Sequence, residues 1–426
     1  MPTLSKPKPV RSALIQGSFA PLHGRGARSN RASRFDGAVR ETDPEFLEQQ
    51  HLEAASAALS DGHAGPAPGK AQGLDRAAGD AQALANQAND AERAAAPNAR
   101  PAETPWQVVQ TIRTQVSREH ARSIISRNES PDIPFDRSIN PYRGCEHGCV
   151  YCYARPTHAY LGLSPGLDFE TRLYAKENAA SQLEIELRRP GYRPAMLALG
   201  ANTDPYQPIE KDLRITRGVL QVLARFGHPV SITTKSALIL RDLDVLRELA
   251  QRNLVQVQIS IGTLDRSIAR TLEPRASTPA LRLEAIRNLA QEGVPTGVIA
   301  APLIPALTDA HLEAVLESAA AAGAGFAAYT MLRLPLEVRD LFVEWLEEFA
   351  PLRARHVMNQ VRELRGGKDN EAQFGRRMTG TGVIAQLLRR RFEIACRRLG
   401  LDEKRSPLAT NRFAVPEQPG AQQRLF

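Results

Sequence analysis

The chain has 426 residues, of which 42% are hydrophobic and 24% charged, so it can bury a substantial core; this excludes a chain disordered throughout and a small disulfide-stapled scaffold. It has four cysteines, no charged-then-apolar leader and no run of 18 apolar residues, which favours a reducing, cytoplasmic location and argues against secretion or membrane spanning. The formal net charge of +8 is concentrated at the two ends, where residues 1–40 carry +7 and residues 353–412 carry +9, so nucleic acid is one partner that the charge allows.

The first part of the chain, residues 1–104, is expected to be mostly disordered. It begins basic and polar, and residues 53–100 are dominated by Ala with Gly, Gln, Asp and Pro. Such a stretch has too few large apolar side chains to offset the entropy lost on ordering. We expect that the Arg/Gly/Asn segment 23–36 can nevertheless attach to the folded body. The remaining boundaries are predicted as a folded core over 105–345 and a basic helical extension over 346–426.

From Trp106 onward, β-type runs alternate with amphipathic helical runs. The spacing of Val108, Ile112 and Val116 predicts a first helix. Strands are then predicted at 138–140, 195–200, 230–234, 255–261, 296–301 and 325–329, separated by runs with helical periodicity around 213–223, 243–249 and 281–289. Further helices are predicted at 339–349, 352–364 and 382–399.

This alternation predicts an α/β fold with a parallel sheet, curled into a partial (βα)6 barrel. In such folds the functional site lies at the carboxyl ends of the strands. Polar side chains at those ends are therefore candidates for binding. The cysteine-rich segment follows the first predicted barrel strand, 138–140.

The most informative segment contains Cys145, Cys149 and Cys152, spaced C-x3-C-x2-C. In a reducing compartment such a group is expected to bind metal. Structural zinc sites usually take four ligands in two pairs, and the fourth cysteine, Cys396, is far away in the sequence. Three thiolates from one loop suit three irons of a [4Fe–4S] cluster and leave the fourth iron open. A zinc protein, and a nucleic-acid-binding protein with a structural or redox-sensing cluster, are the alternatives.

With its cysteine spacing and six βα units, the chain resembles the radical SAM superfamily over roughly residues 130–340. The resemblance implies that the open iron binds S-adenosyl-L-methionine (SAM). It further implies that one electron from the cluster cleaves SAM to methionine and a 5′-deoxyadenosyl radical, which takes hydrogen from a substrate that the sequence does not define. A flavodoxin- or ferredoxin-like reducing partner is also implied.

The resemblance suggests six cofactor-binding residues. They are Tyr151, Thr203, Asp204, Lys235, Ser260 and Arg275. Four of them have plain structural alternatives: Thr203 and Asp204 can belong to an ordinary Asn-Thr-Asp-Pro turn, Lys235 can open a helix, and Arg275 can form a surface salt bridge with Glu273. His147, between the cluster cysteines, is expected to be an exposed loop residue. Catalytic residues that act on the substrate are not predicted.

More narrowly, residues 140–156 and 203–208 resemble the spore photoproduct lyase-related branch. Within it the chain is similar to a bacterial subgroup that carries Arg-Gly-x-x-Ser-Asn, here residues 25–30, and Phe-Gly-x-Arg-Met, here residues 374–378. The lyase uses a hydrogen-donor cysteine, and this sequence has none between Cys152 and Cys396. Cys396 fits the core stripe of a helix. The same helix is expected to present one dense positive face, formed by Arg389, Arg390, Arg391, Arg397 and Arg398.

Overall fold

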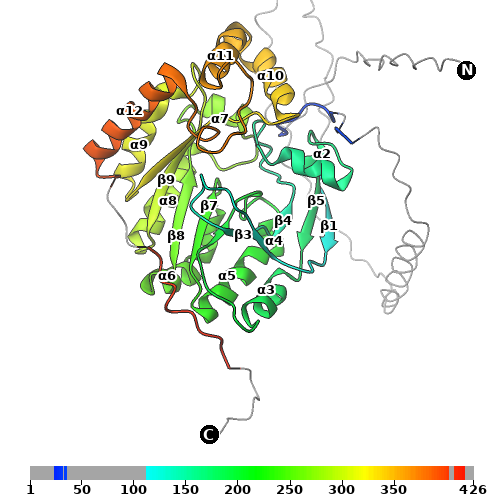
Figure 1. Cartoon of the computed structure of the whole chain (residues 1–426), viewed down its shortest axis with the longest axis vertical. Coiled ribbons are helices and arrows are strands. Elements are labelled where there is room, and N and C mark those ends of the chain that lie inside the picture. The colour runs from blue at the N-terminus through cyan, green and yellow to red at the C-terminus, as the bar shows by residue number, and fades with distance from the viewer. Residues whose placement is uncertain (1–23, 32, 36–111, 403–406, 418–426) are drawn as a thin grey trace, which may run out of the picture. The chain divides into compact units, whose positions relative to one another are not determined.

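The computed structural model describes residues 24–31, 33–35, 112–402 and 407–417 (Figure 1). The predicted disordered region 1–104 therefore falls largely outside the described residues, and so does Val108 of the predicted first helix. The described residues all belong to one compact unit. The boundaries predicted at 105–345 and 346–426 stay predictions.

The main sheet has seven strands, in the order β10-β9-β8-β7-β6-β3-β2. Their bounds are β2 Ile125–Arg127, β3 Arg137–Ile139, β6 Leu197–Leu199, β7 Val230–Thr234, β8 Val255–Ser260, β9 Thr296–Leu303 and β10 Ala327–Met331. The six strands from β3 to β10 run parallel, and β2 pairs antiparallel with β3 at the edge. All six predicted barrel strands are thus confirmed, in sequential order across the sheet.

Helices connect these strands and follow the last one. Their bounds are α2 Asp168–Thr171, α3 Ala179–Leu187, α4 Glu210–Leu213, α5 Ile215–Phe226, α6 Leu243–Gln251, α7 Arg266–Leu272, α8 Pro279–Gln291, α9 Leu312–Ala321, α10 Val338–Phe349, α11 Pro351–Leu364 and α12 Gly382–Leu399; three 3₁₀ helices lie at Arg155–Leu161, Ala237–Asp242 and Asp309–His311. The starts follow local chemistry: the Thr278 hydroxyl caps α8, and Pro279 occupies its first turn. α12 ends at Gly400, whose φ of 67° suits glycine.

The two faces of the parallel sheet differ in polarity. In β8, Val255, Val257 and Ile259 are fully buried in the core, which also holds residues of the surrounding helices. Gln256 and Gln258 alternate with them and are half-buried on the other face. The Gln256 side chain donates to the hydroxyl of Ser231 on the neighbouring strand (3.1 Å). The face of the sheet that points away from the hydrophobic core is therefore polar, and this polar face extends to the carboxyl ends of the strands.

A second, three-stranded sheet was not predicted. In it β1 (Gln115–Glu119) pairs parallel with β5 (Arg172–Lys176), and β4 (Tyr142–Arg143) pairs antiparallel with β5. The predicted helix through Val116 is wrong because this segment satisfies its backbone groups by pairing with residues 57 positions later. Local periodicity carries no signal of such a distant partner.

The basic helix α12 differs from its prediction as well. Arg391 forms a two-bond ion pair with Glu313 of α9 (2.6 and 2.7 Å), and Arg398 pairs with Glu317 of the same helix. The prediction of one dense positive face is therefore wrong. With 3.6 residues per turn, two of the five arginines point toward α9. Cys396 is 3% exposed in the core, as predicted. None of the helices described in the structure is long and apolar enough to cross a membrane.

Candidate metal centre

The three cysteines lie on a loop whose backbone is fixed at both ends. The Cys145 amide donates to the carbonyl of Phe169 (2.9 Å), and the Val150 amide donates to the carbonyl of Leu272 (3.0 Å). Gly144, just before the first cysteine, has a φ of 76°, and a Cβ there would lie 2.8 Å from the Phe169 carbonyl oxygen. The loop thus needs glycine at this position, for its backbone angle and for close packing.

The thiols of this loop share one electrostatic environment. Cys145 and Cys149 are each 7% exposed, and Cys152 is half-buried. Burial raises the pKa of the Cys149 thiol to about 12; the charge of Lys235 opposes this increase, and Glu273 and Cys152 add to it. Burial likewise raises the pKa of Cys145, and the charges of Asp204, Cys149 and Cys152 raise it further. The three sulfurs therefore lie close enough to interact with one another.

This donor set fits an iron–sulfur cluster. A bound metal holds a coordinating thiol in its deprotonated form, which reverses the effect of burial on the free thiol. Within the described part of the chain, no three Cys, His or acidic side chains come close enough to share a single metal ion. An iron–sulfur cluster does not require three side chains at one metal ion, because each thiolate binds a different iron.

Gln207 holds the backbone on either side of Cys145. Its side chain is fully buried; Oε1 accepts from the amide of Glu146 (2.9 Å), and Nε2 donates to the carbonyl of Gly144 (3.2 Å). Gln207 comes from the segment after β6, so it connects the first two parallel strands at their carboxyl ends. Sequence reasoning missed this residue, although it lies in the Thr-Asp-Pro-Tyr-Gln-Pro motif at 203–208.

Asp204, from the same segment, joins the cluster loop to the end of β7. One carboxylate oxygen accepts from the Thr234 hydroxyl (2.7 Å); the other accepts from the Lys235 amide (2.8 Å) and lies 3.3 Å from Nδ1 of His147. Burial alone would raise the pKa of Asp204, but His147 and these hydrogen bonds lower it to about 2. His147 is 2% exposed, so its predicted exposure is wrong: the contact with Asp204 turns it inward.

A buried network lies beneath the second half of the cluster loop. The Tyr151 hydroxyl donates to Glu273, and Glu273 forms an ion pair with Arg282, whose side chain is 2% exposed. Burial would raise the pKa of Glu273, but Arg282 and Lys235 lower it below its usual range. Tyr151 is therefore held in place through its hydroxyl. The sequence did not reveal Arg282, which lies in the apolar pattern of α8.

Lys235 is a cation that interacts with the Cys149 thiol and lacks a close acidic partner within the described residues. Its Nζ lies 5.9 Å from the centroid of the Tyr151 ring, and no acidic oxygen of the described residues is within ion-pair distance. Burial would lower its pKa, but Cys149 and Glu273 raise it above the usual range. The ammonium group thus stays charged beside the cluster loop, where it can bind a carboxylate.

The other three predicted cofactor residues have their polar atoms engaged. The Thr203 hydroxyl donates to the carbonyl of Tyr142 (3.2 Å), and the Ser260 hydroxyl donates to the carbonyl of Ala301 (3.2 Å). Arg275 forms an ion pair with Glu146 of the cluster loop (3.2 Å), and not with Glu273. Thr203 and Ser260 lie at the carboxyl ends of β6 and β8, and Arg275, between α7 and α8, contacts the cluster loop.

The described N-terminal segment packs against the back of this loop. The amides of Gly26 and Ala27 donate to the two carboxylate oxygens of Glu170 (3.0 and 2.8 Å). Glu170 also forms a fully buried ion pair with Arg155, whose Nε donates to the carbonyl of Cys149 (2.9 Å). The expected attachment of segment 23–36 to the folded body is confirmed for the described residues.

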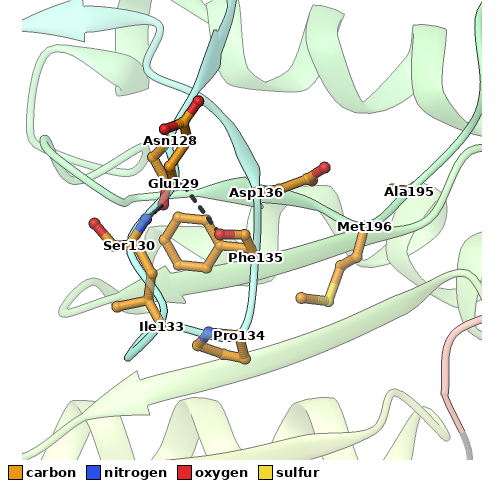
Figure 2. A pocket seen from close by; sticks show the side chains of 9 residues that line it. All are labelled: Asn128, Glu129, Ser130, Ile133, Pro134, Phe135, Asp136, Ala195 and Met196. Carbon is orange, nitrogen blue, oxygen red and sulfur yellow. Dashed lines mark hydrogen bonds between the residues drawn. The ribbon is translucent and has the colours of Figure 1, made fainter. Parts of the chain in front are cut away.

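A pocket of about 420 Å³ lies elsewhere (Figure 2). It is lined by the loop between β2 and β3, from Asn128 to Asp136, and by Ala195 and Met196, which precede β6. Figure 2 shows Phe135 and Met196 in its wall, with the Asn128 amide bonded to the Phe135 carbonyl (3.0 Å). These residues lie at the amino ends of β3 and β6, whereas the cluster loop follows the carboxyl end of β3. The pocket is thus separate from the cysteine site.

Several known proteins are similar to this chain. A family model described as the radical SAM superfamily matches residues 139–319. The protein Rv2578c of Mycobacterium tuberculosis, described as uncharacterized, is 38% identical over 290 residues, which cover 67% of this chain and 82% of that protein. The protein MJ0683 of Methanocaldococcus jannaschii, also described as uncharacterized, is 28% identical over 171 residues, or 40% of this chain and 61% of that protein. Among solved structures, spore photoproduct lyase complexed with dinucleoside spore photoproduct has a TM-score of 0.48 at 14% identity, over 67% of this chain and 79% of that chain.

Proposed function

Because this chain belongs to the radical SAM superfamily, we propose that the thiolates of Cys145, Cys149 and Cys152 hold three irons of a [4Fe–4S] cluster, and that SAM binds at the remaining iron. The reduced cluster supplies the electron for cleavage of SAM to methionine and a 5′-deoxyadenosyl radical, which takes hydrogen from the substrate. The observation that carries the proposal is the gathering of three interacting thiols on one anchored loop at the carboxyl end of β3. A flavodoxin- or ferredoxin-like donor would supply the electron.

The chain's own residues hold this loop rigid. Gln207 bonds to the backbone on both sides of Cys145, and Arg155 bonds to the carbonyl of Cys149. Asp204 ties His147 to the end of β7. The ligands therefore keep their spacing without metal, so less ordering entropy is lost when the cluster binds.

Lys235 and Asp204 are the residues that we assign to SAM. The Lys235 ammonium group binds the carboxylate of the methionine moiety, because it is charged and has no ion-pair partner within the described residues. Asp204 stays ionised at any physiological pH and attracts the cofactor's ammonium group to the same strand ends. Tyr151, held by Glu273, forms an apolar wall beside the loop, while Thr203, Ser260 and Arg275 shape the backbone around the cofactor.

The test is an anaerobic assay on protein reconstituted with iron and sulfide. With dithionite as the reductant, the wild-type protein should convert SAM to 5′-deoxyadenosine, and Cys149→Ala should lose both the cluster and the product. Cys396→Ala is the matched control, because this thiol is buried in the core at α12. Iron bound without any cleavage of SAM would favour a nucleic-acid-binding protein with a structural or redox-sensing cluster. Unchanged iron in Cys149→Ala would refute the ligand assignment.

A further inference from the structure

Arg333 lies just past the carboxyl end of β10, beside the cluster loop. Its guanidinium carbon is 5.2 Å from the centroid of the Tyr153 ring, and Tyr153 directly follows Cys152. Stacking on an aromatic face fixes the orientation of a guanidinium group. The Tyr153 hydroxyl in turn donates to the carbonyl of Ala201, in the segment after β6. The side chain is thus placed at the strand ends, where substrates bind in barrel folds.

The hydrogen-bonding capacity of Arg333 is largely unused. Its Nε is buried and has no partner within the described residues, and Nη1 makes a weak 3.8 Å contact with the sulfur of Met378. No described acidic side chain forms an ion pair with it, although most other arginines around the site have one. A half-buried guanidinium group left without an acceptor is unfavourable. An oxyanion arriving from solvent would supply the missing acceptors in the bidentate geometry that arginine favours.

Two other arginines, Arg377 and Arg365, interact electrostatically with Arg333. Arg377 makes two bonds to Asp132 (2.6 and 2.8 Å), so its charge is compensated. Arg365 is 1% exposed and donates to the carbonyls of Leu332 and Arg377, which joins the residue before Arg333 to the 374–378 motif. Burial lowers the pKa of Arg333, and Arg377 lowers it further. Two carboxylates, Asp132 and Glu371, therefore oppose three guanidinium groups.

We propose that Arg333 binds an anionic group of the substrate, a phosphate or a carboxylate, beside Tyr153 at the carboxyl end of β10. This inference rests on the proposed function, since it takes the strand ends beside the cluster loop as the place where the substrate reacts. The inference also gives a role to the Phe-Gly-x-Arg-Met motif at 374–378. The backbone amide of Met331 donates to the Met378 carbonyl (2.9 Å), so this motif lies against the end of β10.

The substrate is a better source of this anion than the cofactor. Lys235 lies beside the thiols and Tyr151, and it can bind the carboxylate of SAM. Arg333 instead lies over Tyr153, which is 47% exposed and faces outward from the loop. The two cations thus lie against two different aromatic rings and can bind two different anions.

The experiment is calorimetric titration of the cluster-loaded protein, with and without saturating SAM, at constant ionic strength. Phenyl phosphate and benzoate are the probes, because they share an aromatic ring and differ in the anion. We expect one of them to bind, and its affinity to fall about tenfold or more in Arg333→Gln, since hydrogen bonds to a charged group are lost. Arg333→Lys keeps the positive charge but loses the paired hydrogen-bond donors of the guanidinium group, so its affinity for the probe should lie between those of the wild type and Arg333→Gln. Arg353→Gln, at an exposed position of α11, should bind like the wild type.

Each outcome decides the proposal. The probe that binds identifies the anion as a phosphate or a carboxylate. Equal affinity in the wild type and Arg333→Gln, at unchanged iron content, would overturn the proposal, and so would the failure of both probes to bind. A loss of SAM affinity in Arg333→Gln would overturn it too, by assigning the arginine to the cofactor. The titration does not require SAM cleavage, so its result is independent of the test of the proposed function. The anion site can be confirmed when SAM is not cleaved, and it can be refuted when SAM is cleaved.

Discussion

Replacement of Gly26 by alanine tests whether the N-terminal segment holds the cluster loop. A Cβ at Gly26 would lie 1.7 Å from the carbonyl oxygen of Gly148, whereas real Cβ contacts are essentially never shorter than 3.0 Å, so the two segments must separate by at least 1.3 Å. Gly148 immediately precedes Cys149. Overpacking of this kind destabilises a site by about 1–3 kcal/mol. If that energy favours opening of the loop, iron should be lost roughly 5- to 150-fold faster.

The assay follows release of iron to a ferrous chelator under anaerobic conditions, after reconstitution to equal iron content. Gly24→Ala is the matched control: Gly24 has a φ of 74°, so alanine is strained there by about 1–2 kcal/mol, but nothing lies within 4 Å of the added Cβ. We expect fast release in Gly26→Ala and near wild-type release in Gly24→Ala. Equal rates in the two variants would show that the segment does not support the loop.

Three further predictions concern stability and the ligand set. Burial lowers the pKa of His228 to about 4, whereas the histidine of the unfolded chain titrates near 6.5, so protonation favours the unfolded state. As pH falls from 7 to 5, this residue should therefore lower the free energy of unfolding by about 2 kcal/mol. In denaturant titrations, the free energy of unfolding of His228→Gln should depend less on pH than that of the wild type, by the same amount. Equal pH dependence in the variant and wild type would contradict the linkage. Glu273→Gln leaves Arg282 buried without its carboxylate and should lower the free energy of unfolding by about 3–5 kcal/mol; a loss below about 1 kcal/mol would mean that the ion pair is not formed. Cys396→Ala should reduce stability by about 1 kcal/mol and leave the iron content unchanged, whereas a loss of iron would make this thiol a ligand.

The parallel sheet could be predicted because its signals are local. In β8 the alternation from Val255 to Ser260 marks a strand with one buried and one polar face, and the runs between strands have helical periodicity. β1 could not be predicted, since its partner β5 lies far along the chain and no pattern in Gln115–Glu119 identifies it. The same limit applies to Arg391 and Arg398, whose partners lie on α9.

The cysteine loop could be predicted from spacing, but its supports could not. Asp204 was predicted because an acidic residue at a barrel strand end indicates a site. Gln207 and Arg155 bond to backbone atoms of the loop, and Glu170 bonds to the N-terminal segment and to Arg155; such contacts leave no sequence signature. His147 was expected to be an exposed loop residue and not an iron ligand, because three cysteines already suffice; its contact with Asp204 depends on how two loops meet.

Mössbauer spectroscopy of the ⁵⁷Fe-loaded protein tests the coordination by Cys145, Cys149 and Cys152 most directly. Three protein ligands on four irons leave one iron distinct, so addition of SAM under anaerobic conditions should change the signal of one iron in four and leave the other three unchanged. Four equivalent irons that do not respond to SAM would mean that a fourth protein ligand occupies the open position, and the account of this site would be wrong.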